Sequence, residues 1–308
     1  MPSRPQQNAG KDSPDITVSI VNWNTRDELA NCLESVFAQE GADYEVIVVD
    51  NGSRDGSADM VASRFPQVRL IANKDNRGFS RAQNQALAAS RGRYVMMLNP
   101  DARIVESDSL AKLVAFGDSE PQIGVIGVRI LNVDGSLQFS ARRFPTLGAG
   151  VFRNTFLGRL FPKNRYVKEY LMTDWKHDEV RDVDWVSGAA LTVRREALED
   201  IGSLDERFFM YCEDVDFCHR AHGKGWRVCY FPRSTVIHRI AASSDLAQIR
   251  MIYQFHRSMR LFFQKHYSSG WPLHTRLIVL LGLTARMSCF IALNMIKRAV
   301  GKRGSRSG

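Results

Sequence analysis

Two aspartates follow apolar runs of the sequence, at positions where a ligand could bind. Asp50 ends one run, and Asp101 comes three residues after another. A carboxylate at Asp50 would suit ribose hydroxyls or a pyrimidine N–H, but it would equally support a turn at Asn51-Gly52. Asp101 suits a divalent cation, because phosphate and water supply the other ligands of a cation bound to a diphosphate. His238 is a candidate second ligand, although a lone histidine is more often structural.

Three acidic residues lie within four positions of each other at Glu213, Asp214 and Asp216. They begin a predicted helix, where acidic side chains also complement the helix dipole. The cluster carries more charge than a helix start needs, so we expect a general base at the rim of a cleft. Asp216 is rotated by about 200° from Asp214 around the helix, so we expect it to point away from that cleft.

The five cysteines include no Cys-x-x-Cys pair, and we expect free thiols in a reducing compartment. Cys212, Cys218, His222 and Cys229 are close enough in sequence to raise zinc as an alternative, but their spacing matches no zinc-finger or ribbon pattern. Buried core cysteines are therefore the favoured interpretation. The sequence also lacks a Gly-x-Gly-x-x-Gly dinucleotide motif, a phosphate-binding P-loop and a Gly-x-Ser-x-Gly elbow.

Alternating strands and helices must position these residues. Runs rich in β-branched residues predict strands, and alternate with predicted helices, the first of which starts with a capping box from Thr25 to Glu28. This alternation predicts an α/β fold with a doubly wound, mainly parallel sheet. The strands are expected at 16–21, 46–49, 68–71 and 94–98, and the helices at about 25–39, 60–65 and 80–90.

Ligands bind at the carboxyl ends of the strands in such sheets. Three of the predicted strands end in polar residues that suit a ligand: Asn22-Trp23-Asn24, Asp50-Asn51 and Asn99-Pro100-Asp101.

Residues 142–184 are rich in aromatic and charged residues but show little periodicity, so we expect an irregular segment that shapes a binding site. Regular structure is expected to return with Trp185 to Ala190. It continues with helices near 194–200 and from Glu213 to about His222, and with a strand near 228–231.

The net charge of +9 is concentrated in the tail. No acidic residue follows Asp245, whereas eleven Lys and Arg residues do, so residues 1–245 carry a net charge of −2. The first 14 residues are polar with three prolines and predict a disordered leader without a signal peptide. A basic tail is typical of contact with nucleic acid or with an anionic membrane surface.

The apolar segment 277–296 favours the membrane over nucleic acid. Ten of its twenty residues are Leu, Ile, Val or Phe, which contribute roughly −3 to −6 kcal/mol toward insertion. Its central Arg286 costs about 2.5 to 3.5 kcal/mol. A span would also carry the following cations outward, so we expect an interfacial helix on the cytosolic face rather than a single-pass span. Packing on the protein or in a homodimer is the alternative.

Several segments together resemble the family 2 inverting glycosyltransferases, and some match their rhamnosyltransferase-like branch. The general segments are 16–24 (ITVSIVNWN), 46–57 (VIVVDNGSRDGS) and 76–80 (NRGFS) with Asn84. The branch segments are 98–101 (LNPD), 209–220 (FMYCEDVDFCHR), Gly225-Trp226 and 230–238 (YFPRSTVIH). The resemblance covers about residues 15–267.

The resemblance implies a Rossmann-like GT-A fold, a nucleotide-sugar donor and Mg²⁺ or Mn²⁺. It implies that Asp50 contacts the nucleotide, with Asn22, Asn24, Asn76, Gly78, Asn84 and Asn99 around the nucleotide sugar. Asp101 would be the last acid of the metal motif, with His238 as helper, and Asp214 the catalytic base beside Glu213. Trp185, Ser187 and Gly188 would face the donor sugar and the acceptor. The family's first metal-motif aspartate is Asn99 here, a variant that is usual in this branch.

The expected organisation is a catalytic domain at 15–240 and a helical tail at 241–308. The donor half of the domain would span about 15–130 and the acceptor half about 131–240. The expected reaction moves a sugar, best rhamnose from dTDP-rhamnose, to a hydroxyl of a lipid-linked saccharide in cell-envelope polysaccharide synthesis. A UDP-hexose or UDP-galactofuranose donor is one alternative, and a non-catalytic sugar-nucleotide-binding scaffold is another.

Overall fold

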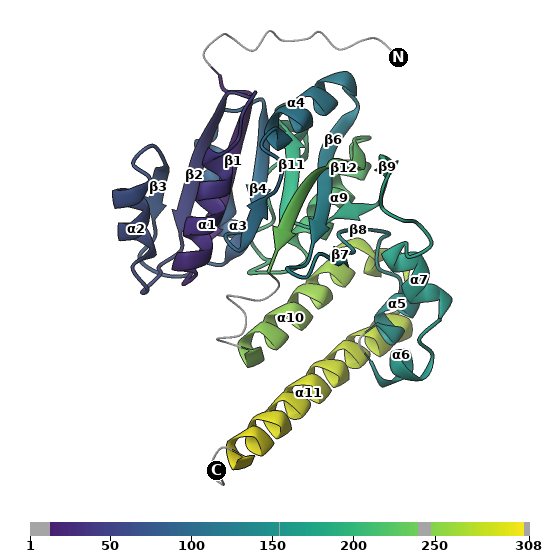
Figure 1. Ribbon diagram of the computed structural model, residues 1–308. Helices are drawn as coiled ribbons and strands as arrows, with labels where there is room; N and C mark the ends of the chain where they lie inside the picture. The colour runs from purple at the N-terminus through teal and green to yellow at the C-terminus, as the bar shows by residue number, and fades with distance from the viewer. Residues whose placement is uncertain (1–12, 154, 240–247, 305–308) are drawn as a thin grey trace.

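The computed structural model describes residues 13–153, 155–239 and 248–304, so most of the expected leader lies outside it. The N-terminal half forms parallel strands in the order β3-β2-β1-β4, with helices between them (Figure 1). This confirms the predicted doubly wound arrangement. The strands are β1 (Ile16–Asn22), β2 (Tyr44–Asp50), β3 (Arg69–Ala72) and β4 (Tyr94–Leu98), and the helices are α1 (Arg26–Phe37), α2 (Ser57–Arg64) and α3 (Phe79–Ala89).

The register of these strands aligns their carboxyl ends. Asn22 at the end of β1 pairs with Asp50 at the end of β2, and Ile20 pairs with Leu98 of β4. Side chains of β1 alternate between two apolar layers. Ile16, Val18 and Ile20 pack with α1 and α2 on one face, whereas Val21 packs toward α3 on the other.

The capping box predicted at Thr25 is wrong. Thr25 is the N-cap residue of α1, but its side chain accepts no bond from the helix. Its hydroxyl instead donates to Asn22 Oδ1 at 2.6 Å. Both side chains are buried, and buried polar groups need a hydrogen-bond partner within the protein. Thr25 therefore fixes a strand-end amide rather than the helix start.

The second half of the sheet is mixed. Strand β11 lies antiparallel between β4 and β6, and β12 runs parallel to β6 and ends beside β5. The elements are β5 (Ala102–Ile104), α4 (Ser109–Ser119), β6 (Ile123–Leu131), β7 (Leu137–Gln138), β9 (Arg181–Asp182), β11 (Ala190–Arg194), α8 (Arg195–Ile201), α9 (Glu213–Gly223) and β12 (Arg227–His238). Strands β8 (Ala141–Arg142) and β10 (Trp185–Val186) form a separate pair.

The segment expected to be irregular holds three short helices, α5 (Leu147–Phe152), α6 (Phe156–Leu160) and α7 (Arg165–Leu171). Each begins at a residue whose side chain accepts a backbone N–H of the first turn, namely Thr146, Thr155 and Asn164. Helices of five to seven residues are too short to show a periodic pattern, which explains why the sequence did not reveal them.

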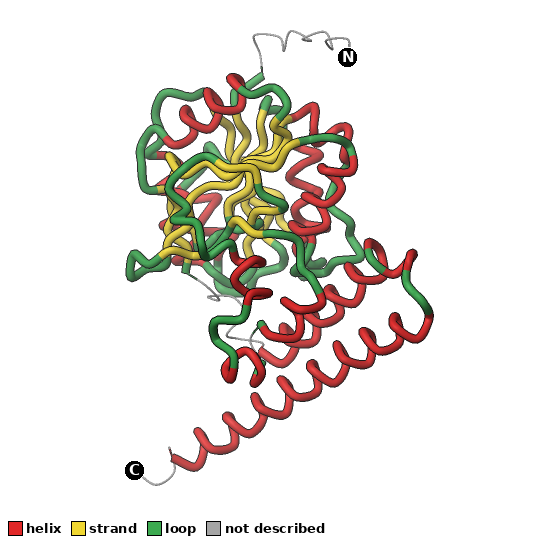
Figure 2. The backbone as a smooth tube through the Cα atoms, turned by 90° about the vertical axis from the view of Figure 1, so that its right-hand side faces the viewer, coloured by secondary structure: helices red, strands yellow, loops and turns green. Residues whose placement is uncertain are grey.

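The tail divides into two helices with different surroundings. Helix α10 (Gln248–His266) packs against α9, where Phe262 is buried in the same apolar cluster as Phe217. Helix α11 (Leu273–Gly304) folds back along α10 and projects beyond the sheet (Figures 1 and 2). Within the described residues, Leu273–Ile296 is the one helix long and apolar enough to cross a membrane, by length and composition.

Candidate active site

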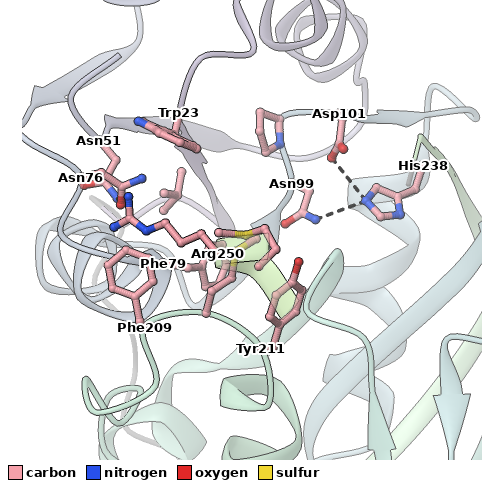
Figure 3. Close-up of a pocket in the computed structure, with 14 residues that line it drawn as sticks. Trp23, Asn51, Asn76, Phe79, Asn99, Asp101, Phe209, Tyr211, His238 and Arg250 are labelled. Carbon is pink, nitrogen blue, oxygen red and sulfur yellow. Dashed lines mark hydrogen bonds and ion pairs between the residues drawn. The ribbon is translucent and has the colours of Figure 1, made fainter. Parts of the chain in front are cut away.

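A cleft of about 210 Å³ opens at the carboxyl ends of β1, β2 and β4. Figure 3 shows side chains from both halves of the sheet and from α10 converging on it. The lining residues are Val21, Trp23, Asn51, Asn76, Phe79, Asn99, Pro100, Asp101, Phe209, Met210, Tyr211, His238, Arg250 and Met251. The fold thus gathers strand-end residues from distant parts of the chain at one place, as parallel sheets do.

Amide side chains build one wall of the cleft. Asn51 donates to Asn76 Oδ1 at 3.1 Å and to the Gly78 carbonyl at 3.2 Å. Gly78 has a φ of 89° and a Cβ there would lie 2.7 Å from the Phe209 ring. This close approach lets Phe79 N–H donate to the Phe209 carbonyl at 2.6 Å, which joins the start of α3 to the loop before α9.

Asp50 lies behind this wall and supports the local turn. Its carboxylate accepts from Asn22 Nδ2 at 2.9 Å and from Ser53 N–H at 3.0 Å. Asn24 sits at a φ of 53°, and its N–H donates to Ser53 Oγ at 2.9 Å. The turn role of Asp50 is therefore visible in the geometry. Its side chain is buried and does not line the cleft, so its contact with a nucleotide stays a prediction.

Asp101, Asn99 and His238 meet at the opposite end of the cleft (Figure 3). His238 Nε2 lies 3.3 Å from Asp101 Oδ1 and 3.2 Å from Asn99 Nδ2. An amide nitrogen can only donate, so Nε2 accepts and the ring proton sits on Nδ1, which is 3.1 Å from Gln138 Oε1. Gln138 is held by its own donation to the His238 carbonyl at 2.6 Å.

This arrangement fits a divalent cation. Asp101 Oδ1 and Nε2 lie close enough to share one cation, toward which the single lone pair of Nε2 would turn from the Asn99 amide. In the described part of the chain, no group of three or more His, Cys, Asp or Glu could hold a metal by itself. Two protein ligands suffice where a diphosphate and water supply the rest, as Mg²⁺ sites commonly require.

Asp214 lies at the start of α9, where backbone donors orient it. Its Oδ2 accepts from Gly188 N–H at 2.9 Å and its Oδ1 from Val215 N–H at 2.8 Å. Burial raises the pKa of Asp214, and these two donors partly oppose the shift. A Cβ on Gly188 would lie 3.3 Å from Asp214 Cβ, so the absence of a side chain at 188 makes room for the carboxylate.

Glu213 has different surroundings from its neighbour. It is 8% exposed, and its Oε2 has no hydrogen-bond partner. Burial raises the pKa of Glu213, and the adjacent Asp214 charge raises it further. The residues just before it, Tyr211 and Cys212, both have positive φ values, 69° and 65°. Such strain concentrates at functional sites.

One segment positions both ends of the candidate active site. Ala189 accepts Asn99 N–H at 2.9 Å, while the preceding Gly188 N–H holds Asp214. Ser187 N–H donates to Ser140, which anchors the segment to the neighbouring loop. The metal motif and the acidic pair are therefore linked through residues 187–189, directly before β11.

Of the predicted site residues, the cleft is lined by Asn76, Asn99, Asp101 and His238. The others do not line it: Asn22, Asn24, Asp50, Gly78, Asn84, Trp185, Ser187, Gly188, Glu213 and Asp214. Trp185 is buried in the core beneath Arg142, and its Nε1 donates to the Arg143 carbonyl. Asn84 joins α3 to the loop before α9 by exchanging hydrogen bonds with the Leu204 backbone. Neither residue lines the cleft.

Asp216 points toward α10. It is fully buried and bonded by Arg220, Lys265 and His266.

The structure adds residues that the sequence did not indicate. Arg250 of α10 reaches the cleft and lies over the Phe209 ring, 5.5 Å from its centroid. Gln138 also contributes, because it contacts His238 from behind. Trp23, which the sequence indicated only as part of a strand-end segment, lines the cleft. The sequence placed Arg250 only among the tail cations, and no local spacing distinguishes it from them. The five cysteines are free thiols, with Cys32, Cys218 and Cys229 buried.

Comparison with known proteins assigns the family. The family model "Glycosyl transferase family 2" matches residues 17–202. The chain is 31% identical over 267 residues to the N-acetylglucosaminyl-diphospho-decaprenol L-rhamnosyltransferase of Mycobacterium tuberculosis, covering 83% of this chain and 86% of that protein. It is 27% identical over 232 residues to the rhamnosyltransferase WbbL of Escherichia coli, covering 72% and 83%.

Solved structures agree on the fold. The mannosyltransferase PcManGT from Pyrobaculum calidifontis, in complex with GDP-Man and Mn²⁺, superposes with a TM-score of 0.56 at 19% identity, covering 90% of this chain and 70% of that one. Staphylococcus aureus TarS 1–349 with UDP gives 0.55 at 18% identity, covering 88% and 71%. The chain therefore belongs to the family 2 glycosyltransferases, and it is a glycosyltransferase with their GT-A fold.

Proposed function

We propose that the enzyme transfers rhamnose from dTDP-rhamnose, with inversion, to a hydroxyl of a lipid-linked saccharide in cell-envelope polysaccharide synthesis. Two relatives carry rhamnosyltransferase names, and one of these names specifies a diphospho-decaprenol acceptor. A UDP-hexose or UDP-galactofuranose donor is the alternative. The single observation that carries the catalytic proposal is the linkage of Asn99, two residues before Asp101, to Asp214 through residues 187–189.

The proposed reaction is a single displacement. The acceptor oxygen forms a bond to the anomeric carbon, the bond from that carbon to the diphosphate oxygen breaks, and the nucleoside diphosphate leaves with the electron pair. The acceptor proton passes to Asp214, whose raised pKa makes it a better proton acceptor than an ordinary aspartate. Attack from the face opposite the leaving group inverts the anomeric configuration.

The donor cleft would hold the nucleotide sugar between the amide wall and the Asp101–His238 pair. A bound Mg²⁺ or Mn²⁺ would neutralise the charge of the leaving diphosphate. Arg250 adds a positive charge beside the cleft, where it would attract the diphosphate. Asn51 and Asn76 would place the nucleotide through their fixed amides.

Location on the cytosolic membrane face is part of this proposal. Helix α11 is apolar and presents exposed Leu277, Ile278 and Leu281. An interfacial position would leave the cleft in the cytosol, where nucleotide sugars are made, and close to a lipid-linked acceptor. A single-pass span is less favoured because Arg286 in the middle of α11 is bonded to α5.

Thermal unfolding with a panel of sugar nucleotides tests the donor assignment. We expect dTDP-rhamnose with Mn²⁺ to raise the unfolding temperature more than UDP-glucose or UDP-galactofuranose, because a bound ligand stabilises the folded state. Product formation with the same donor must follow. Binding without turnover on any saccharide acceptor would favour the scaffold alternative, and a larger shift with a UDP sugar would replace the donor.

Two substitutions separate the roles of the acids. Asp214→Asn is expected to reduce turnover by about 10² to 10⁴ while donor binding stays near wild type. Asp101→Asn is expected to weaken both cation and donor binding and to slow turnover as well. Near wild-type turnover in a folded Asp214→Asn variant would show that Asp214 is not the general base.

A further inference from the structure

We propose that helix α6 binds an anionic bilayer together with α11, so that the membrane surface consists of two segments more than a hundred residues apart. This inference rests on the proposed location at the membrane. It extends that proposal to a part of the catalytic region that neither the basic tail nor the family assignment identifies.

The first observation is the exposure of large apolar side chains on α6. Phe156 is 76% exposed, Leu160 58% and Phe161 54%, within a segment of six residues. Large apolar residues gathered in this way mark interaction sites more often than single exposed ones do. Leu147 and Val151 of the adjoining α5 are also about half exposed and enlarge the patch.

The second observation is that α5, which packs against α6, is bonded to α11. Arg286 donates to the carbonyls of Gly150 and Arg153, both at 3.1 Å, near the end of α5. Burial lowers the pKa of the Arg286 guanidinium, and the two carbonyls replace part of its lost hydration. Figure 1 shows α5, α6 and α11 on the side of the molecule away from the sheet.

These bonds tie the middle of α11 to the end of α5, the helix that precedes α6. Leu277, Ile278 and Leu281 are 50% to 68% exposed on the turns before Arg286. The one charge inside the apolar segment is thus bonded to protein carbonyls. Two apolar surfaces from separate segments consequently lie on the same side of the molecule.

The third observation is charge. Arg159, Lys163, Arg165 and Lys168 are exposed on and after α6, whereas the only acidic residue in 142–172 is Glu169. Cations bordering an apolar patch are complementary to a surface of anionic head groups over an acyl layer.

The same charges argue against a second copy as the occupant. A twofold dimer through this patch would bring the same surface of both copies together. The cations of α6 and α7 would then face the same cations of the partner, with one acidic residue in this segment to offset them. An anionic bilayer satisfies both the apolar and the charged part of the patch, and it is the occupant we propose.

Vesicle binding of the full-length protein tests the proposal. The double variant Phe156→Ser, Leu160→Ser is expected to bind vesicles of phosphatidylglycerol and phosphatidylcholine at least tenfold more weakly than wild type. The matched control is Val133→Ser, which removes a side chain 68% exposed in the turn before β7, and it should bind like wild type. Lys163→Gln, Arg165→Gln should weaken binding to these vesicles but not to pure phosphatidylcholine.

Further readouts distinguish the outcomes. Unchanged vesicle binding of a folded double variant, judged by its unfolding temperature, would overturn the proposal. A wild-type dimer that the double variant converts to monomer, with vesicle binding unchanged, would also overturn it in favour of a second copy. Turnover on a water-soluble acceptor should survive the double variant, because α6 touches no cleft residue named above. If wild type shows no turnover but the vesicle results are as expected, the proposed function would be refuted and the membrane proposal would stand.

Discussion

Adjacent carboxylates in the active site have unequal environments. Asp214 accepts two backbone N–H groups, whereas one oxygen of Glu213 has no partner and the side chain is buried. An uncompensated buried charge is costly, so Glu213 favours its protonated form. The two residues are therefore proposed to act differently: Asp214 would receive the acceptor proton, and Glu213 would stay protonated beside it.

Glu213→Gln is expected to stabilise the protein in a pH-dependent way. The pKa of Glu213 is raised by burial and by Asp214, so its stabilising contribution is complete below the unfolded pKa of about 4.3. That contribution is lost as the pH rises through the higher folded value. The variant should therefore match wild type near pH 4 and unfold at a higher temperature near pH 8. Thermal unfolding across this range measures it, and an equal shift at both pH values would contradict the explanation.

Gln138 is expected to act as a positioning residue for the metal pair. It accepts His238 Nδ1–H and thereby holds the ring with Nε2 directed toward Asp101. Loss of such a partner typically costs about 10- to 100-fold in metal affinity. Gln138→Leu should therefore weaken Mn²⁺ binding in the presence of UDP. The electron paramagnetic resonance signal of free Mn²⁺ measures this binding. Ser136→Ala is the control, because Ser136 contacts only Asp134 and Asn132 in the same turn. Equal affinities would exclude the role.

At the scale of elements, helix α10 packs on the loop before α9 and so supports the candidate active site. Ser258 donates to the Met210 carbonyl at 2.7 Å, and Phe255 packs edge-on against Tyr211. Lys265 joins Asp205 and Asp216, with distances of 2.8 and 2.6 Å. The loop before α9, which includes the two residues with positive φ, is thereby fixed from the side of α10.

Asp216→Asn is expected to destabilise the contact between α9 and α10. Removing one partner from a buried ion pair typically costs about 3–5 kcal/mol; here Arg220 loses its carboxylate partner, and Lys265 keeps only Asp205. Burial alone would raise the pKa of Asp216, but bonds from His266 and Lys265 outweigh it and lower the pKa. The stabilisation is therefore present above the unfolded pKa of about 3.9 and is lost as the pH falls through the folded value.

Denaturant unfolding of the variant and wild type at pH 7 and at pH 3 measures this difference. The gap should be wide at pH 7 and narrower at pH 3. Asp108→Asn is the surface control: Asp108 pairs with Lys112 one turn on and is about half exposed, so its loss should cost less than about 0.5 kcal/mol. A gap as large at pH 3 as at pH 7 would mean that the ion pair is not its source.

The elements with strong local signals were predictable. The buried β1, β2 and β4 are short runs dominated by apolar residues, so the sequence predicts that the residues at their ends, Asn22, Asp50 and Asn99, lie at one edge of the sheet. Strand β11 was harder, because its antiparallel insertion between β4 and β6 depends on tertiary pairing that has no local pattern.

Side-chain partners were the least predictable part of the site. Thr25 bonds back to Asn22 rather than to its helix, and Trp185 turns into the core. The Thr25 partner lies only three residues away and the Trp185 partner 42 residues away, and neither choice is marked by a local pattern. Arg250 reaches the cleft because α10 packs on the loop before α9. The spacing of apolar residues within one helix does not specify that packing.

At the scale of the whole molecule, Arg286 determines how α11 can meet a membrane. Arg286→Leu removes the bonds to α5 and also the cost of about 2.5–3.5 kcal/mol for placing Arg in a bilayer centre. We expect the variant to unfold at a lower temperature and its α11 to span the membrane in part of the molecules.

An impermeant thiol reagent applied to intact cells reports the topology. With Ser307→Cys as the target, the wild-type background should stay unlabelled and the Arg286→Leu background should be labelled. Arg276→Leu is the matched control, since Arg276 is exposed near the start of the same helix. Labelling of the wild-type background would show that α11 spans the membrane and would end the interfacial proposal.

The bonds of Arg286 also have a consequence for the order of events during synthesis. Its acceptors on α5 precede it by 136 and 133 residues, and a ribosome adds about 5–20 residues per second. The acceptors therefore leave the ribosome roughly 7 to 27 seconds before Arg286 does. Most domains fold within a second or so, which gives the catalytic body time to present those carbonyls before α11 emerges. Docking of α11 on α5 can therefore begin before insertion by the translocation machinery. The order of these segments along the chain thus influences its final topology.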